Sequence, residues 1–453
     1  MSQPAVLKRS LSLFHVVIFG VSYMVPLTVF TTYGVATQVS QGMLPAAYVF
    51  ALLAMVFTAY SYGRMVKVMP VSGSAYTYTQ KSFNPHIGFL VGWAILMDYL
   101  FMPMLNYLIG GMYLSSYFPN IPQSVWIVVL ILITTCISVF GVKTATTING
   151  LIILFQYLFL IVFVGLSIHG ILNGLGTGTL LSIKPFYNPD VPLSSVISAA
   201  SILCLSFLGF DAVTTVSEEA IRPEKNIPKA ILIITLLCGG QYIFISYIGH
   251  MIFPDYHLFQ NADSASTELM TYIGGNLFNS IFIAGTVPIV LAVNLVTKAS
   301  VTRILFAMGR DSVLPPKVFG YIHPKFKTPV FNILLVGLLS LTAMFVDLVT
   351  ATSFINFGAL VAFTFVNLSV IAWYVVRNKR RSPKDLLLYL ILPLIGAGFT
   401  IWLWTNLDYH SLTLGAIWVG LGFIYLLYLT KMFTKRPPEM DFSEAETEKE
   451  VGA

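Results

Sequence analysis

The sequence predicts an all-α polytopic membrane protein whose twelve transmembrane helices form a 5+5 inverted repeat, with helices 1 and 6 broken. The first observation is composition: 57% of the residues are hydrophobic and 10% are charged, with a mean hydropathy of +0.82. Soluble domains carry about 25% charged residues. The second is a series of apolar segments of about 20 residues, the length that crosses a bilayer. The third is an interruption at matching places in two of these segments.

The twelve apolar segments set the expected division of the chain. We expect spans at 11–37, 43–66, 87–114, 124–142, 149–173, 193–218, 227–252, 277–302, 330–346, 350–376, 386–405 and 413–433. An odd number of spans in one unit inverts the next unit, so spans one to five and six to ten form the two repeats. The divisions are a cytoplasmic N-terminus (1–10), the first repeat (11–174), the second repeat (193–376), spans eleven and twelve (386–433) and an acidic cytoplasmic tail (434–453).

Positive charges follow this division. With the N-terminus inside, all Lys and Arg except Lys184 fall in inner segments, and Lys298 is counted among them. A Lys/Arg bias in short loops sets membrane topology. The net charge of +6 and the pI near 9.0 are therefore explained by topology, and nucleic-acid binding is not expected. Acidic residues favour the outer side, which indicates either a cation-attracting vestibule or simple avoidance of Lys and Arg there.

The two interrupted spans indicate where a ligand binds. The first interruption lies within 20–30 and the second within 205–211, about 180 residues apart. Unpaired backbone groups at membrane depth are tolerated only where they face a cavity or a ligand. Paired interruptions at equivalent positions are typical of the midplane site of a secondary transporter. Pro26 frees the carbonyl of Ser22, and no glycine lies between Gly20 and Gly34, so the first break should favour a cation over a carboxylate.

Asp98 is the ionisable residue placed deepest in a predicted span. It lies eleven residues into span three, about half the hydrocarbon thickness at about 1.5 Å per residue. An acid at this depth is costly and indicates function. It could bind a substrate ammonium, carry a coupling proton or pair with a buried cation; the alternative is a structural carboxyl bonded to nearby hydroxyls. Tyr99 could hold an ammonium by a cation–π contact or could serve packing alone.

Three further acids follow the second break. Asp211 can reach the cavity, and a carboxyl shielded from water suits a proton carrier near neutral pH. Glu218 and Glu219 come two turns later, next to Arg222 and Lys225. We interpret these two glutamates as an inner-gate ion-pair cluster, with direct substrate contact as the alternative.

The chain lacks the sequence signatures of enzymes. It has no P-loop, no GxSxG and no HExxH, and its seven His residues are scattered. Cys136, Cys204 and Cys238 lie within apolar spans without metal-ligand spacing, so we expect them to be core thiols. We therefore predict no catalytic residues, no metal and no cofactor.

Several segments resemble the amino acid–polyamine–organocation superfamily over essentially the whole chain. They are 70–78 (PVSGSAYTY), 207–219 (FLGFDAVTTVSEE), 226–230 (NIPKA), 303–311 (RILFAMGRD) and 323–329 (HPKFKTP). The resemblance implies the leucine-transporter-type fold, with substrate bound between spans one, three, six, eight and ten. Within the superfamily, 98–103, 347–352 and 355–369 are similar to bacterial putrescine importers.

Two positions depart from these relatives. Thr31 stands where putrescine importers usually carry Asp, and since a diamine needs two anions, this change allows a monoamine or an amino acid instead. Gln156 stands where proton-coupled amino-acid relatives carry a Lys, so proton coupling would need another group. Asp211 matches a position at which arginine/agmatine exchangers keep an acid.

Together these features predict a permease of the cytoplasmic membrane that imports a small cationic amine such as putrescine, or an amino acid, by alternating access. Its partners would be this solute, a proton and the bilayer, with no obligatory protein partner. The alternatives are a zwitterionic amino acid importer, an exchanger and a non-transporting sensor. We expect Asp98 and Tyr99 to hold the ammonium and Asp211 to carry the proton. The other expected lining residues are Tyr23, Thr28, Thr31, Phe207 and Gly209.

Overall fold

The computed structural model describes residues 11–438 apart from 71–73, 141–145, 218 and 327, and these residues are almost entirely helical. Their only β-type pairing is an isolated bridge between Leu11 and Ala220. In chain order the longer helices are α1 (Leu13–Met24), α2 (Tyr33–Val39), α3 (Leu44–Val68), α4 (Ser74–Ser82), α5 (Pro85–Tyr117), α6 (Gln123–Phe140), α7 (Thr146–Leu172), α8 (Leu193–Leu203), α9 (Pro223–Ile252), α10 (Ala265–Arg310), α12 (Val330–Ser340), α13 (Leu348–Val370), α15 (Leu392–Thr405) and α16 (Tyr409–Leu429).

Short helical pieces complete the description. The 3₁₀ turns are η1 (Pro26–Phe30), η2 (Cys204–Phe207), η3 (Ala212–Val216), η4 (Tyr256–Leu258), η5 (Ala262–Ser264) and η6 (Leu341–Met344). Two stretches, η7 (Ile371–Arg377) and η8 (Leu387–Ile391), are π-helical. The single-turn helices are α11 (Pro316–Phe319) and α14 (Pro383–Leu386).

The membrane class is confirmed. Among the described residues, eleven helices are long and apolar enough to cross a bilayer, and each falls on a predicted span. The remaining predicted span, 330–346, corresponds to a shorter apolar helix over Val330–Met344. On α7, Leu151, Leu154, Leu158 and Ile161 are all more than half exposed, at intervals that keep them on one helical face. In a membrane protein this face contacts lipid.

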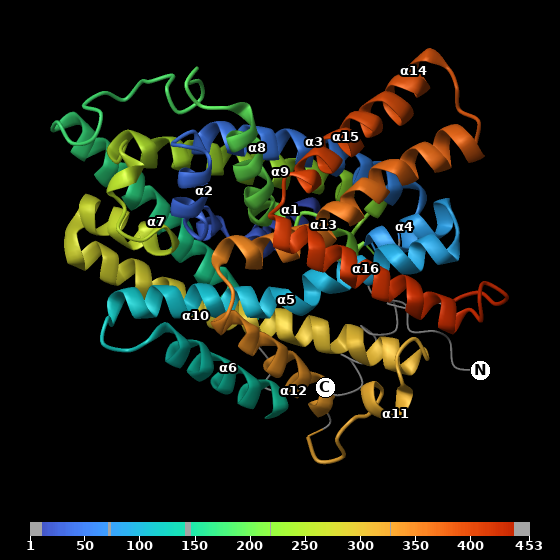
Figure 1. Cartoon of the computed structure of the whole chain (residues 1–453). Helices are drawn as coiled ribbons and strands as arrows, with labels where there is room; N and C mark the ends of the chain where they lie inside the picture. The colour runs from blue at the N-terminus through green and yellow to red at the C-terminus, as the bar shows by residue number, and fades with distance from the viewer. Residues whose placement is uncertain (1–10, 71–73, 141–145, 218, 327, 439–453) are drawn as a thin grey trace.

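The helices pack in two adjoining groups around the broken spans (Figure 1). In one, α3 packs along α9. Helix α9 contacts α1 of the first broken span, and α3 contacts α8 of the second. In the other, α5 packs along α10 and against α6, while α12 covers α6 and α10. Helix α13 packs against both α5 and α3, and so connects the two groups.

Two assignments made from the sequence are wrong. Lys298 does not lie in a loop: it is inside α10 and fully buried, with its Nζ 2.6 Å from the Thr135 hydroxyl and 5.5 Å from the centre of the Tyr107 ring. Charge counting missed this because it assigned Lys298 to the same inner segment as Arg303 and Arg310, although Lys298 falls within the predicted span 277–302. Cys136 is exposed on α6, whereas Cys204 and Cys238 are buried as expected.

Candidate functional site

A partly enclosed cavity of about 120 Å³ lies beside both helix breaks. Four parts of the chain form its wall: the first broken span, the end of the second break (η2 and Leu208), α5 and α10. Its lining residues are Tyr23, Met24, Val25, Leu27, Thr28, Thr31, Met102, Leu105, Asn106, Ile109, Tyr113, Leu205, Leu208, Phe282, Thr286, Ile289, Val290, Val293 and Thr297. The lining contains hydroxyls, one amide and apolar side chains, but no charged residue.

The first break is held open by side chains of neighbouring helices. Helix α1 ends at Met24, Val25 has φ 50° and ψ 96°, and Pro26 begins η1. The Met24 carbonyl accepts hydrogen bonds from the Tyr242 hydroxyl (3.0 Å) and the Thr28 hydroxyl (3.1 Å). Because a proline cannot donate to the carbonyl four residues earlier, an interruption here follows from the sequence.

Two glutamines complete the support of this break. Gln241 donates from Nε2 to the Pro26 carbonyl at 3.0 Å, and the Leu27 amide donates to Oε1 of Gln156 at 3.1 Å. The freed backbone groups at Met24, Pro26 and Leu27 therefore have protein partners, as membrane depth requires. The carbonyls of Met24 and Pro26 already accept hydrogen bonds from protein side chains. Fewer backbone acceptors than predicted are therefore left to bind a cation, and side chains must supply most of the attraction.

The second break touches the first. After η2 the chain is extended at Leu208, and Gly209 has φ 118°, a conformation that favours glycine. A Cβ atom built on Gly209 would lie 2.5 Å from Cδ1 of Tyr23. The Gly209 amide donates to Oδ1 of Asp211 at 3.3 Å, which orients the carboxyl group directly after the break.

Asp98, Asp211 and Tyr23 are buried close enough together to interact electrostatically. The two carboxyls interact electrostatically with each other, and both interact with the Tyr23 hydroxyl. Asp98 lies one helical turn before Met102, a cavity-lining residue of α5. Among the described residues the one ion pair is Arg310–Asp311. Neither Asp98 nor Asp211 therefore has a Lys or Arg within salt-bridge distance. Two acids without a cationic partner at this depth form a site suited to a cation.

The structure brings some predicted site residues together and separates others. Tyr23, Thr28 and Thr31 line the cavity. Asp98, Tyr99 and Asp211 are outside the lining, but both carboxyls interact electrostatically with Tyr23. Tyr99 also interacts with both carboxyls and with Tyr23.

Two of the expected lining residues lie behind the cavity wall. Phe207 is fully buried against the ring of Tyr242, with ring centres 5.7 Å apart, and is not part of the lining. Gly209 is also outside the lining, next to the lining residue Leu208 and against the ring of Tyr23.

The predicted inner gate is only partly visible. Glu218 lies outside the described residues. Glu219 makes no ion pair with Arg222 or Lys225, all three being described; instead its carbonyl accepts the Leu11 amide at 3.0 Å. The Ile221 amide donates to the Leu11 carbonyl at 2.9 Å, so this segment is joined to the start of the chain through main-chain bonds.

Sequence reasoning missed the lining residues of α5 and α10. On α5, Met102, Asn106, Ile109 and Tyr113 follow Asp98 at helical spacing, so continuing along the face of Asp98 would have found them. The Nδ2 atom of Asn106 is buried without a hydrogen-bond partner and is available to a ligand acceptor. On α10 the lining residues repeat at the same spacing, among them Thr286 and Thr297.

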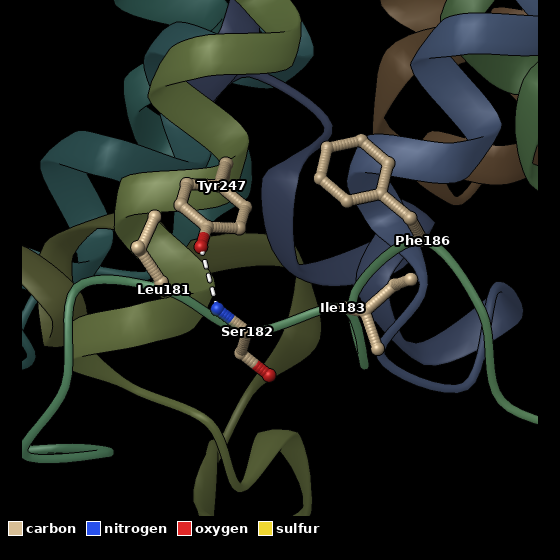
Figure 2. Close-up of a pocket in the computed structure, with 5 residues that line it drawn as sticks. All are labelled: Leu181, Ser182, Ile183, Phe186 and Tyr247. Carbon is tan, nitrogen blue, oxygen red and sulfur yellow. Dashed lines mark hydrogen bonds between the residues drawn. The ribbon is translucent and has the colours of Figure 1, made fainter.

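A second, open depression of about 400 Å³ lies between α9 and the segment that follows α7 (Figure 2). Its lining residues are Leu181, Ser182, Ile183, Phe186 and Tyr247. The Tyr247 hydroxyl accepts the Ser182 amide at 2.9 Å and donates to the Leu180 carbonyl at 3.0 Å. These bonds attach the segment to α9, and the lining contains no charged side chain that could attract a cation.

Comparison with known proteins decides the family. The sequence profile described as "Amino acid permease" matches residues 15–412. The chain belongs to the amino acid permease family. This permease is 43% identical over 436 residues to the "Low-affinity putrescine importer PlaP" of Escherichia coli K12, an alignment that covers 96% of each chain. It is 28% identical to the "Methylthioribose transporter" and 27% identical to the "Branched-chain amino acid permease BcaP" of Bacillus subtilis, with 94% of each chain covered.

The resemblance to the superfamily is therefore confirmed, and the permease is a membrane transporter rather than an enzyme. Its apolar helices and these relatives place it in a membrane that it crosses many times. Its solute is a small molecule of the amine or amino-acid class.

Proposed function

We propose that this permease imports a small cationic amine, with putrescine as the first candidate, across the cytoplasmic membrane by alternating access. The observation that carries the proposal is the pair of carboxyls, Asp98 and Asp211, which lie beside the cavity without a basic partner. An ammonium group placed against them supplies the missing positive charge. The similarity to a putrescine importer over 96% of both chains supports the same solute class.

The cavity can hold the parts of an amine beyond its first ammonium group. Methylene groups fit against Met102, Leu105 and Ile109 on α5. The far end offers Thr31 and Asn106, which can accept hydrogen bonds but carry no charge. A diamine would therefore bind one ammonium by charge and the other by neutral acceptors, which suits a transporter of low affinity for its solute.

A zwitterionic amino acid is the second candidate solute. The buried Nδ2 atom of Asn106 lacks a partner in the structure and could donate to a substrate carboxylate. In this alternative the α-ammonium binds the carboxyl cluster and the carboxylate binds toward Asn106. Import or exchange of an amino acid would then replace amine import.

The proposal includes the finer architecture. Val330–Met344 is taken as a short twelfth span beside the eleven long ones, and spans one to five and six to ten as inverted repeats. Both ends of the chain are placed in the cytoplasm, in keeping with the distribution of Lys and Arg. Asp211 is the proposed proton carrier, because its carboxyl follows the second break and interacts with the ammonium site at Asp98.

The test is uptake of labelled putrescine into proteoliposomes with an imposed pH gradient and membrane potential. Asp98→Asn should abolish uptake because it removes charge from the ammonium site while keeping its shape. Asp211→Asn should retain equilibrium exchange but lose accumulation driven by the pH gradient. Asp190→Asn is the control, since Asp190 is an exposed acid outside the cavity.

Competition separates the two solutes. Inhibition by unlabelled amines alone supports amine import, whereas accumulation of an amino acid without putrescine uptake supports the second candidate. Unchanged transport by Asp98→Asn, with normal insertion into the membrane, would exclude the proposed role of Asp98.

A further inference from the structure

A cluster of arginines and aromatic rings lies where three candidate spans end. Arg64 lies four residues before the end of α3, Arg377 ends η7, and Arg380 follows in the turn that leads to α14. We call these three arginines, together with the rings of Tyr60, Trp373, Tyr374 and Tyr389 that they contact, the arginine–tyrosine cluster. The ends of spans lie at the level of the lipid headgroups, where Lys and Arg interact with anionic lipid.

Two tyrosines form the centre of the cluster. The rings of Tyr374 in η7 and Tyr389 in η8 stack in parallel, with centres 4.0 Å apart and planes 1° apart. The guanidinium of Arg64 lies 5.4 Å from the centre of the Tyr389 ring, and that of Arg380 lies 6.0 Å from the same ring. Arg380 is also 5.7 Å from the Tyr374 ring. One pair of rings thus brings two cations together.

Further contacts orient these side chains. Arg64 lies 4.7 Å from the Tyr60 ring, and the Tyr374 hydroxyl donates to the Arg64 carbonyl at 3.2 Å. Arg377 lies 4.7 Å from the Trp373 ring and donates to the Lys81 carbonyl at 3.1 Å, which connects the cluster to α4. Aromatic contacts hold a guanidinium in place while leaving much of its hydrogen-bonding edge available.

The cluster has no carboxylate to balance it. None of the three arginines makes an ion pair with a described acid. Asp385 is the nearby acid in sequence, and its carboxyl accepts the Ser382 hydroxyl at 2.8 Å within the cap of α14. Arg64 is half-buried, whereas Arg377 and Arg380 are exposed. Like charges gathered without a counterion are stabilised when an anion binds between them.

Exposed apolar side chains lie next to the cluster in sequence. Val376, Leu387 and Ile391 are 64%, 50% and 45% exposed, and they lie on the same two π-helical segments or at their ends. An anion that also carries acyl chains would match both parts of this surface. Free phosphate has no acyl chains, so it would contact the arginines but not the apolar side chains.

We propose that the arginine–tyrosine cluster binds the phosphate headgroup of an anionic phospholipid. The forked guanidinium groups of Arg64 and Arg380, which share the Tyr389 ring, pair with the phosphate oxygens, Arg377 adds a positive charge at the end of the same span, and the acyl chains lie along the adjacent apolar side chains. Because Arg377 also contacts α4, a bound lipid stabilises the packing of α4 against α13. This inference is independent of the solute that the permease carries.

The experiment is a titration of the purified full-length permease with short-chain phosphatidylglycerol. Short-chain phosphatidylcholine is the zwitterionic control, and inorganic phosphate tests the anion without acyl chains. We expect saturable binding of phosphatidylglycerol, little binding of phosphatidylcholine and only weak competition by phosphate. Phosphate binding as tight as that of phosphatidylglycerol would overturn the assignment to a lipid.

Matched variants test the location of the site. Replacing Arg64, Arg377 and Arg380 together by Gln should weaken binding about a hundredfold, at about fivefold per basic residue. Replacing the exposed basic residues Lys431, Lys435 and Arg436 by Gln removes the same charge elsewhere and should leave binding unchanged. Equal losses in the two triple variants would show that surface charge alone attracts the lipid.

A charge-preserving variant guards against misfolding. Replacing the same three arginines by Lys keeps every positive charge but removes the forked donor geometry. We expect it to insert into membranes as the wild type does and to bind phosphatidylglycerol more weakly. Wild-type affinity in this variant would exclude oriented guanidinium–phosphate contacts.

Discussion

Replacing Gly209 by Ala should damage both the stability and the transport activity of the permease. Gly209 lies in the second break with φ 118°, and its Cβ position is 2.5 Å from Cδ1 of Tyr23. A side chain in such a backbone conformation costs about 1–3 kcal/mol. Overpacking against a buried neighbour costs about another 1–3 kcal/mol. The variant should therefore unfold more easily by about 2–6 kcal/mol.

A double-mutant cycle separates the two contributions. In a Tyr23→Ala background the clash with the Tyr23 ring is gone and the nearest remaining atom is the main-chain carbonyl carbon of residue 23 at 3.3 Å, so Gly209→Ala should cost mainly the backbone strain, about 1–3 kcal/mol. The difference between the two backgrounds measures the contact between the breaks. Thermal unfolding in detergent gives the stabilities, and uptake into proteoliposomes shows whether the altered break still transports.

The control is Gly398→Ala in α15, where no heavy atom lies within 4 Å of the added Cβ position. This variant should keep wild-type stability and uptake. Gly209→Ala with unchanged stability and uptake would refute the reasoning, because neither the positive φ nor the contact with Tyr23 would then constrain the break.

Two more substitutions test the support of the site. Gly358→Ala should reduce uptake. The added Cβ would lie 2.4 Å from the Ala94 carbonyl oxygen and force α13 away from α5 at the turn that holds Asp98. Wild-type uptake by this variant would contradict the packing. Gln156→Leu should lower the midpoint of thermal unfolding, because it leaves the buried Leu27 amide without its acceptor at a cost of about 1–3 kcal/mol; an unchanged midpoint would show that this hydrogen bond contributes nothing.

The sequence predicted most of the architecture because the relevant signals are local. Span length and apolar content locate most of the helices within a few residues, although α10 extends well beyond both ends of its expected span. Pro26 and Gly209 likewise mark breaks through their own backbone restrictions, and the structure interrupts the helices there. The family could be recognised for the same reason, since its motifs are short and continuous.

The arrangement of side chains around the cavity required the tertiary structure. Depth along a span follows from about 1.5 Å per residue, which placed Asp98 near the middle of α5. The direction in which a side chain points does not follow, because both a lipid-facing and a protein-facing side of a span are apolar. Phe207 therefore turned out to pack behind the cavity, and Cys136 to face outward.

By itself the sequence determined that the chain is a helical membrane protein, where its spans lie and where two of them break, because each property is encoded in neighbouring residues. Only the tertiary structure decided that Asp98 and Asp211 interact with each other and with Tyr23, and that Lys298 is buried with its Nζ atom against the Thr135 hydroxyl. Both outcomes depend on the rotation and packing of helices that are distant in the chain. In an apolar span, hydropathy carries too little information to set that rotation.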